Sequence, residues 1–376
     1  MIQIKPFVFD NRKELKTFIE IPFQLYSNVP QWVPPVRMDV RTMLNKKKHP
    51  FYEHSDAQAF LAYRDGKAVG RIAVMENRLF NQVQHKNVAS FTLLDCEENL
   101  QTLQALVNAA KDWAKARGLD MLVGPKPFGL GEGYGILVEG FELRQMMTMM
   151  NYNLPYLPPL LEKIGFTKEV DFVSCQIETE KFSLPEKVRK VAERVLEKGT
   201  ITVRGFHTRA DIRELGKQIG HVYNEVFVNN WEYYPYTQRE IDVAVENVIL
   251  FADPGLIKVL MDGDRAIGFL FAFPDISPAL KRHQGRLNPL SIVDLMREMK
   301  KADMVSVNGM GVLSEYHGRG GNALLYYEME KTVKSRGFKF AEFTQVAESA
   351  EQMRKDLITL GGAEVKNHRV YRLQIE

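Results

Sequence analysis

Residues 311–331 read GVLSEYHGRGGNALLYYEMEK and place a glycine-rich turn between an extended apolar run and a helix. The turn holds Gly318, Gly320 and Gly321 around Arg319, with His317 just before them. Glycines let backbone N–H groups converge, and a helix N-terminus adds unpaired donors with a partial positive charge. His317 and Arg319 add charge-assisted donors. The pattern favours a phosphate-binding turn; the alternative is a turn that only lets the helix pack tightly.

The flanking residues predict where the strand and the helix lie. Residues 304–313, MVSVNGMGVL, mix β-branched residues with glycines, which predicts a strand interrupted by a bulge or by a close backbone approach. Asn322 is predicted to cap the helix that follows. Within that helix Leu325, Met329 and Val333 recur every four residues, so they should face the core.

The composition is that of an ordinary soluble protein. With 376 residues, 45% of them hydrophobic, the chain has the length of two domains. Its formal charge of +3 lacks the basic excess of a nucleic-acid-binding protein. Cys96 and Cys175 are too few for a disulfide framework, and neither a metal-ligand spacing, a secretory signal nor a membrane-spanning run is evident. We therefore expect a cytoplasmic protein with no metal, nucleic-acid or membrane partner.

A faint internal repeat divides the chain into two copies. Its anchors lie about 200 residues apart and comprise two Asp-Gly hairpin turns, Asp65-Gly66 and Asp262-Gly263, and two tryptophans, Trp32 and Trp231. The second copy carries an extra segment near residues 281–300, as expected of a surface insertion. The predicted domains are residues 1–182 and 183–376.

The order of predicted elements within each copy indicates an α/β fold. Each copy reads as strand, helix, hairpin, strand, long helix, strand, helix and strand, which predicts a mixed, mostly antiparallel sheet flanked by helices. The two long helices are predicted to stop before Gly118 and Gly337, each preceded by an arginine.

The segment VLSEYHGRGGNALL resembles the acyl-CoA-binding segment of the GNAT acyltransferases. Other pieces, among them WVPP, HPFYEH, GYGILVEGF and LGGAEVKNHRVYRL, are similar to bacterial proteins with two GNAT domains in tandem. The resemblance implies that acetyl-CoA or another acyl-CoA is bound by the second copy as co-substrate. Val312 and Leu313 would present backbone groups to the pantetheine arm. The pyrophosphate would be surrounded by His317, Gly318, Arg319, Gly320, Gly321 and Asn322. His317 and Asn322 depart from the family's usual Arg or Gln and Gly or Ala.

The first copy lacks the glycine turn. Asp95, Glu97 and Glu98 occupy the matching region and would repel a pyrophosphate. We therefore interpret residues 1–182 as a degenerate GNAT-like domain that serves as scaffold and as part of the acceptor site.

The resemblance also implies residues for acyl transfer to an amine. Glu348, after the predicted strand 340–346, is the candidate base, although a helix macrodipole alone favours a glutamate there. Asn308 would orient a substrate or support the bulge. GNAT proteins form one wall of the acceptor pocket where this chain has four aromatic residues, which could also be ordinary core: Trp231, Tyr233, Tyr234 and Tyr236. The positions where the family usually has a tyrosine acid hold Leu161 and Leu357.

The leading hypothesis is an acyl-CoA-dependent N-acyltransferase acting on a small-molecule or peptide amine, with its donor in the second copy. One alternative is a non-catalytic acyl-CoA-binding or regulatory protein, which the missing tyrosine favours. A second is an aminoacyl transferase of the peptidoglycan type, which usually carries a long helical arm of a kind that the sequence does not predict.

Overall fold

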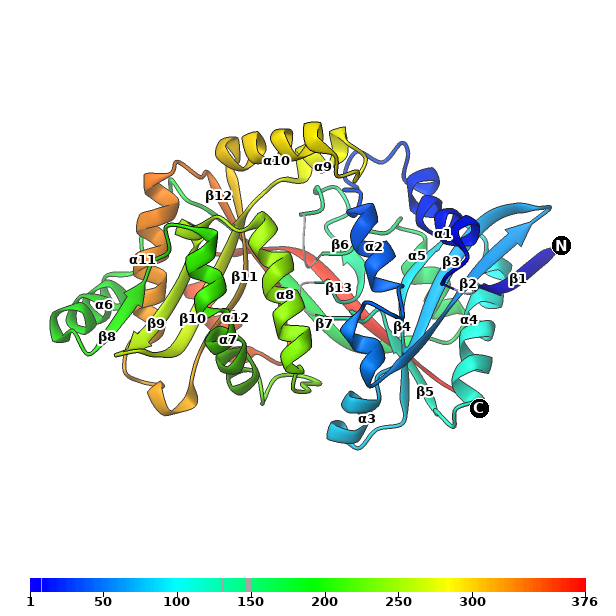
Figure 1. The fold of residues 1–376 in the computed structure, drawn as a ribbon, viewed down its shortest axis with the longest axis horizontal. Helices are drawn as coiled ribbons and strands as arrows, with labels where there is room; N and C mark the ends of the chain where they lie inside the picture. Colours follow the sequence, from blue (N-terminus) through cyan, green and yellow to red (C-terminus); the bar gives the residue numbers. More distant parts are fainter. Residues whose placement is uncertain (8, 130–131, 147–149) are drawn as a thin grey trace. The chain divides into compact units, whose positions relative to one another are not determined.

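A computed structural model describes the whole chain except residues 8, 130–131 and 147–149 (Figure 1). The chain forms two compact units. Unit 1 comprises Met1–Phe172, Ser277–Leu295 and Lys366–Glu376, and unit 2 comprises Val173–Ile276 and Met296–Val365. This division concerns compactness, so the boundary between the two copies at residues 182 and 183 stays a prediction.

Unit 1 is built on the strand order β1-β2-β3-β4-β5-β13, with β6 also paired to β13. Its strands are β1 (Ile2–Phe7), β2 (Asp56–Arg64), β3 (Lys67–Glu76), β4 (Val88–Cys96), β5 (Met121–Gly124), β6 (Ile136–Glu139) and most of β13 (Ala363–Gln374). Its helices are α1 (Arg12–Leu25), α2 (Arg37–Met43), α3 (Arg78–Gln84), α4 (Leu100–Lys115), α5 (Leu157–Lys163) and α9 (Ser277–Arg282), with a 3-10 turn at Pro50–Glu53. β4 and β5 run parallel, whereas the other pairs run antiparallel.

Unit 2 repeats this plan with the strand order β7-β12-β11-β10-β9-β8. Its strands are β8 (Ile201–Arg204), β9 (Ile257–Asp262), β10 (Arg265–Pro274), β11 (Met304–Val312), β12 (Phe340–Ala347) and part of β7 (Thr167–Glu178). Its helices are α6 (Glu186–Lys198), α7 (Arg209–Val226), α8 (Gln238–Phe251), α11 (Gly321–Ser335), α12 (Glu351–Thr359) and the second half of α10 (Pro289–Lys301), with 3-10 turns at Pro254–Leu256 and Ser314–Tyr316. The pair β11–β12 is parallel, like β4–β5 in unit 1. The predicted mixed, mostly antiparallel fold with helices is confirmed.

The two hairpins show why glycine and aspartate recur. In β2–β3 the turn residues Asp65 and Gly66 both have positive φ, 50° and 79°, as a two-residue hairpin turn requires. In β9–β10 Asp262 pairs with Arg265, so the turn is Gly263-Asp264, one residue later than predicted. Gly263 has φ 56°, and a glycine at the first turn position favours this placement.

The long helices α4 and α11 end as the sequence predicts. Gly118 and Gly337 follow them with φ of 73° and 72°, the left-handed conformation that glycine adopts at least cost. On α11 the stripe Leu325, Met329 and Val333 is buried in the core of unit 2. Unit 1 has its own cores, one between α4 and its sheet and one around Phe18 and Phe51.

Helices α7 and α11 cover opposite faces of the sheet in unit 2. A Cβ on Gly311 of β11 would meet Val226 at the end of α7. The next residue, Val312, points to the other face, where it lies near Gly321 at the start of α11. Because successive residues of a strand alternate between faces, β11 is covered on both sides along this stretch.

Candidate functional site

The strands β11 and β12 part in the middle of β11. They pair only from Met304 with Phe340 to Val307 with Phe343. There the β10–β11 register passes from Ala272–Val307 to Phe271–Gly309, which leaves Asn308 as the extra residue of a bulge. The predicted bulge is therefore confirmed. Beyond it, residues 308–312 form an edge of β11 that no longer pairs with β12.

The glycine turn leads from this edge into α11. His317 Nε2 lies 2.9 Å from the Val312 carbonyl oxygen, so the ring folds back onto the strand end. Leu313 already donates its N–H to Ile267 and accepts from Tyr316, both at 2.9 Å. The backbone groups of Leu313, which the resemblance offers to a pantetheine arm, are thus already hydrogen-bonded within the protein.

The start of α11 differs from the sequence-based prediction. Gly320, with φ 87°, is the N-cap residue, and no side chain caps the helix within the described chain. Asn322 is the second helical residue and is exposed, so the prediction that it caps α11 is wrong. The reason is geometric: the left-handed Gly320 starts the helix before Asn322, and a residue inside the first turn is not placed to cap it. The first turn of α11 thus has backbone donors and no capping side chain.

The three glycines of the turn have different roles. A Cβ on Gly320 would lie 2.7 Å from Val195 of α6, and one on Gly321 would lie 2.9 Å from Leu260 of β9. Both glycines therefore let neighbouring elements pack closely, as one of the two alternatives predicts. A Cβ on Gly318 would meet nothing within 4 Å, although its φ is 76°. Gly318 sets the direction of the exposed loop rather than its packing.

The corresponding helix in unit 1, α4, has its N-terminus capped by a side chain. Asn99 is the N-cap of α4, and its Oδ1 accepts from the Thr102 N–H at 2.9 Å. The Thr102 hydroxyl donates to Glu97 at 2.7 Å, and Arg64 pairs with Glu97 at 2.8 Å. Asp95 is buried and paired with Arg71. Asp95 and Glu97, which the sequence suggested would repel a pyrophosphate, are thus engaged within the protein, and the cap itself occupies the helix terminus.

The registers of the two units identify equivalent residues beside these strands. Arg71 pairs with Asp95 across β3–β4, just as Phe269 pairs with Gly311 across β10–β11. In unit 1 the Tyr26 hydroxyl donates to Asp95 at 2.5 Å, and Arg71 donates to Asp95 at 2.7 Å. Burial and the Asp95 carboxylate raise the pKa of Tyr26 well above its usual value. Unit 2 replaces this buried polar trio with aromatic residues and a glycine.

Those aromatic residues form a cluster beside the bulge of β11. Tyr223 of α7 stacks on Phe269 with centroids 5.9 Å apart, and Phe269 stacks on Phe271 at 4.5 Å. Tyr236 lies 6.1 Å from Tyr223 and 4.9 Å from Tyr234. A Cβ on Gly309, next to Asn308, would be 3.7 Å from the Phe269 ring. The cluster therefore reaches the strand where β11 separates from β12.

Two of the four predicted wall residues, Tyr234 and Tyr236, join this cluster. Asn224 fixes the segment, because its side chain exchanges hydrogen bonds of 3.0 and 2.9 Å with the Tyr236 backbone. Trp231 and Tyr233 lie half-buried in the same segment. Sequence reasoning missed Tyr223, Phe269 and Phe271, and also Phe227, whose ring lies 4.6 Å from that of Tyr223. The alternating phenylalanines of GFLFAF were the available signal, since alternate residues of a strand share a face.

The candidate base follows β12, the strand from which β11 separates. Glu348 is half-buried in the turn after β12, three residues before α12 begins at Glu351. It is not in the first turn of a helix, so the macrodipole does not account for it. Leu161 and Leu357, at the positions usual for the tyrosine acid, are both fully buried in apolar cores.

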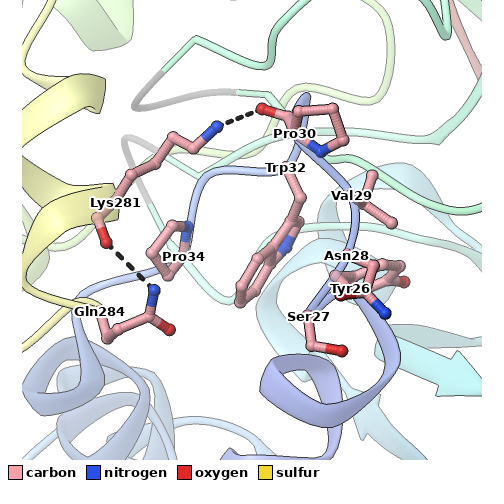
Figure 2. Close-up of a pocket in the computed structure, with 9 residues that line it drawn as sticks. All are labelled: Tyr26, Ser27, Asn28, Val29, Pro30, Trp32, Pro34, Lys281 and Gln284. Atoms are coloured by element: carbon pink, nitrogen blue, oxygen red, sulfur yellow. Dashed lines mark hydrogen bonds between the residues drawn. The ribbon is translucent and has the colours of Figure 1, made fainter.

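Unit 1 contains a surface cavity of about 280 Å³. Its wall includes Tyr26 and Trp32 from the segment after α1, and Lys281 and Gln284 from α9 and the residues behind it (Figure 2). Lys281 donates to the Pro30 carbonyl. Trp32 matches Trp231 in the internal repeat, so this cavity lies at the unit 1 counterpart of the predicted acceptor wall.

Comparisons with known proteins fit this architecture, although no family model matches the chain. A tandem GNAT protein from the clavulanic acid biosynthesis pathway superposes with a TM-score of 0.57 at 11% identity, covering 100% of this chain and 99% of that one. A GCN5-related N-acetyltransferase from Sphaerobacter thermophilus gives 0.53 at 14% identity, over 100% and 96% of the two chains. This chain has a tandem GNAT fold.

Two curated proteins are similar over almost their whole length. The protein named bacterial ceramide synthase, from Caulobacter vibrioides, is 27% identical over 365 residues, which is 95% of this chain and 94% of that protein. Protein YghO of Escherichia coli is 26% identical over 373 residues, 98% and 94% of the two chains. The comparisons support an acyltransferase fold throughout.

Two features are absent from the described residues, a metal-binding cluster and a membrane-spanning helix. No group of three or more His, Cys, Asp or Glu side chains there is arranged to hold a metal ion. No helix there combines the length and the apolar content that crossing a membrane requires.

Proposed function

We propose that the protein is an N-acyltransferase that binds its acyl-CoA donor in unit 2 and acylates an amine carried by a long apolar chain. The observation that carries this proposal is the contrast between the two copies of one structural feature. Helix α11 begins without a capping side chain at the end of a strand that has left its neighbour, whereas α4 is capped by Asn99.

The donor assignment rests on the groups around that helix terminus. An uncapped N-terminus offers backbone donors and a partial positive charge to a pyrophosphate. Arg319 and His317 are exposed in the same turn, and a Cβ on Gly318 would meet no atom within 4 Å. The ladder between β11 and β12 ends at Val307, and the edge of β11 at residues 309–311 is suited to pair with the amide groups of a pantetheine arm. These features fit an acyl-CoA, with the acyl group directed toward Asn308 and Gly309.

The acceptor class rests on the aromatic cluster. A Cβ on Gly309, next to the bulge, would lie nearest to Phe269 and Phe271, and Tyr223 stacks on Phe269. In this proposal the aromatic cluster forms one wall of the acceptor site, where it favours a hydrocarbon chain over a polar substrate. The relative named bacterial ceramide synthase also supports an acceptor with a long hydrocarbon chain, because ceramide is an amide of a long-chain amino alcohol and a fatty acid. We therefore place a long-chain amine ahead of a small polar amine or a peptide.

The chemistry needs few groups from the protein. The amine nitrogen attacks the thioester carbonyl, a C–N bond forms and the C–S bond breaks, and the thiolate of CoA leaves. In this proposal Glu348 accepts the proton that the amine loses, directly or through water, and Asn308 orients the acceptor. Leu357 cannot donate a proton to the thiolate, so water or the proton held by Glu348 serves instead.

The competing functions predict different kinetics. A non-catalytic acyl-CoA-binding protein, favoured by the buried leucines at both acid positions, would bind CoA without releasing it from a thioester. An aminoacyl transferase would require aminoacyl-tRNA rather than acyl-CoA.

The test is release of free CoA from acetyl-CoA and from palmitoyl-CoA, each with sphinganine, spermidine or glucosamine as the acceptor. We expect release that depends on the long-chain amine. Glu348→Gln should lower kcat about 100-fold or more while leaving the Kd for acyl-CoA unchanged, because a general base contributes to the chemical step. Binding of acyl-CoA with no amine-dependent release would support the non-catalytic alternative, and absence of binding would contradict both.

A further inference from the structure

Helix α10 exposes a concentration of large apolar side chains that no other described helix approaches. Leu290, Ile292, Val293 and Met296 are 78%, 49%, 48% and 51% exposed. Every other described helix exposes at most one large apolar side chain to a comparable degree. Single exposed apolar residues are ordinary, whereas a group on one short helix indicates an interaction surface.

The exposed side chains are not a product of a frayed helix end. Asn288 caps α10, because its Oδ1 accepts from the Ser291 N–H at 3.0 Å and its own N–H donates to the Ser291 hydroxyl at 2.7 Å. Ser291 and Leu295, four residues apart, are buried and fix the inward face of the helix. With 3.6 residues per turn, Ile292, Val293 and Met296 then lie on the outward face.

The outward face is also basic. Arg297 and Lys300 share it with the apolar residues, Lys301 lies at its margin, and all three are exposed. Asp294 is turned toward Arg282 and His283, both 2.9 Å from its carboxylate, and Glu298 is half-buried. The outward arc of α10 therefore carries cationic and apolar side chains together, with the acidic side chains of the helix placed away from it.

We propose that this face, which we call the α10 face (Leu290, Ile292, Val293, Met296, Arg297, Lys300 and Lys301), docks on the surface of an anionic lipid bilayer. Lysine is depleted from the centre of protein interfaces, whereas apolar side chains mixed with Lys and Arg are typical of helices that lie in the headgroup region. The apolar side chains enter the upper acyl region and the cationic heads contact lipid phosphates. The helix belongs to the segment that the first copy lacks, so the duplicated fold does not itself require it.

This inference departs from the expectation of no membrane partner that composition alone suggested. It concerns binding to a surface and not a span, and it stands apart from the proposed acyl transfer. A long-chain amine resides in membranes, so docking would bring the protein to such a substrate.

The test is co-flotation of the full-length protein with phosphatidylcholine vesicles that contain 30 mol% phosphatidylglycerol, and with vesicles of phosphatidylcholine alone. We expect binding to the anionic vesicles, weakened by salt. The double variant Ile292→Asp with Val293→Asp should abolish it. Lys300→Glu with Lys301→Glu should lower the affinity about tenfold or more, since each basic residue near an anionic surface contributes several-fold.

Matched controls distinguish this face from general effects. Val228→Asp with Ile358→Asp introduces the same charges at apolar positions that are 54% and 61% exposed elsewhere. Lys13→Glu with Lys16→Glu changes the net charge equally on the exposed side of α1. Both controls should bind anionic vesicles like the wild type. Absence of vesicle binding, binding that the α10 variants leave intact, or a dimer in light scattering that these variants dissociate without any vesicle binding would each overturn the proposal.

Discussion

At the scale of single residues, the two copies differ most clearly where Arg71 and Asp95 face Phe269 and Gly311 across equivalent strands. Arg71 and Asp95 are only 4% and 7% exposed, so each charge depends on the other. A buried pair of this kind contributes little net stability, yet removing one partner leaves the other charge uncompensated. Unit 1 thus has a structural ion pair at the positions where unit 2 has Phe269 and Gly311.

Arg71→Met should lower the free energy of unfolding by about 3–5 kcal/mol, because the Asp95 carboxylate then remains buried without its cation. Adding Asp95→Asn should recover more than half of that loss, since the neutral amide still accepts a hydrogen bond from Tyr26. Urea unfolding of the two variants and of Asp95→Asn alone completes the double-mutant cycle. A loss below about 1 kcal/mol for Arg71→Met would show that Asp95 does not need this partner.

The residue scale also shows where prediction from sequence stops. The glycine turn was apparent from the sequence alone, but its glycines could serve either phosphate binding or tight helix packing. Only the positions of Val195 and Leu260 show that Gly320 and Gly321 serve packing while Gly318 does not. The cap assigned to Asn322 failed because a left-handed glycine can start a helix without a capping side chain.

At the scale of elements, α11 and α6 form the support of the candidate donor site. Gly320 lets α6 approach the start of α11, and Val191 and Val195 are the side chains that would meet a Cβ there. The end of the glycine turn, at Gly320, therefore packs directly against α6. The close approach of α6 thus fixes the start of α11, the part of the candidate donor site that would face a ligand.

Gly320→Ala should be more destabilising than Gly318→Ala by about 1–3 kcal/mol. Both substitutions place a Cβ on a residue with positive φ, at a cost of about 1 kcal/mol. Only the Gly320 variant adds contacts of 2.7 and 2.9 Å to Val195 and Val191, which overpack the helix contact. Equal unfolding midpoints for the two variants in thermal denaturation would contradict the packing role of Gly320.

The elements that sequence reasoning placed best were those with local signals. The helix ends at Gly118 and Gly337 and the bulge in β11 follow from residues adjacent in sequence. The aromatic cluster could not be assembled in the same way, because Tyr223, Phe269 and Tyr236 come from a helix, a strand and a loop. Their meeting depends on tertiary packing that no local pattern records.

At the scale of the whole molecule, duplication explains why one chain contains two versions of a strand, a turn and a long helix. The tandem GNAT fold was predicted from the motif around Gly318 and from the repeat, and the solved structures confirm it. In unit 1 the turn is short and capped, and in unit 2 it is long, glycine-rich and uncapped. In the proposed function, donor binding therefore belongs to unit 2 and structural support to unit 1.

The central claim is that assignment, and one matched pair of variants tests it most directly. Asn322 and Gln101 are each the exposed second residue of equivalent helices, α11 and α4. Asn322→Asp and Gln101→Glu each place a carboxylate at a helix N-terminus, where it suits the macrodipole, so neither should destabilise the protein. Isothermal titration with CoA should give a Kd raised about five- to tenfold for Asn322→Asp, through repulsion of the pyrophosphate, and an unchanged Kd for Gln101→Glu. The reverse result, or equal effects of the two substitutions, would contradict donor binding in unit 2.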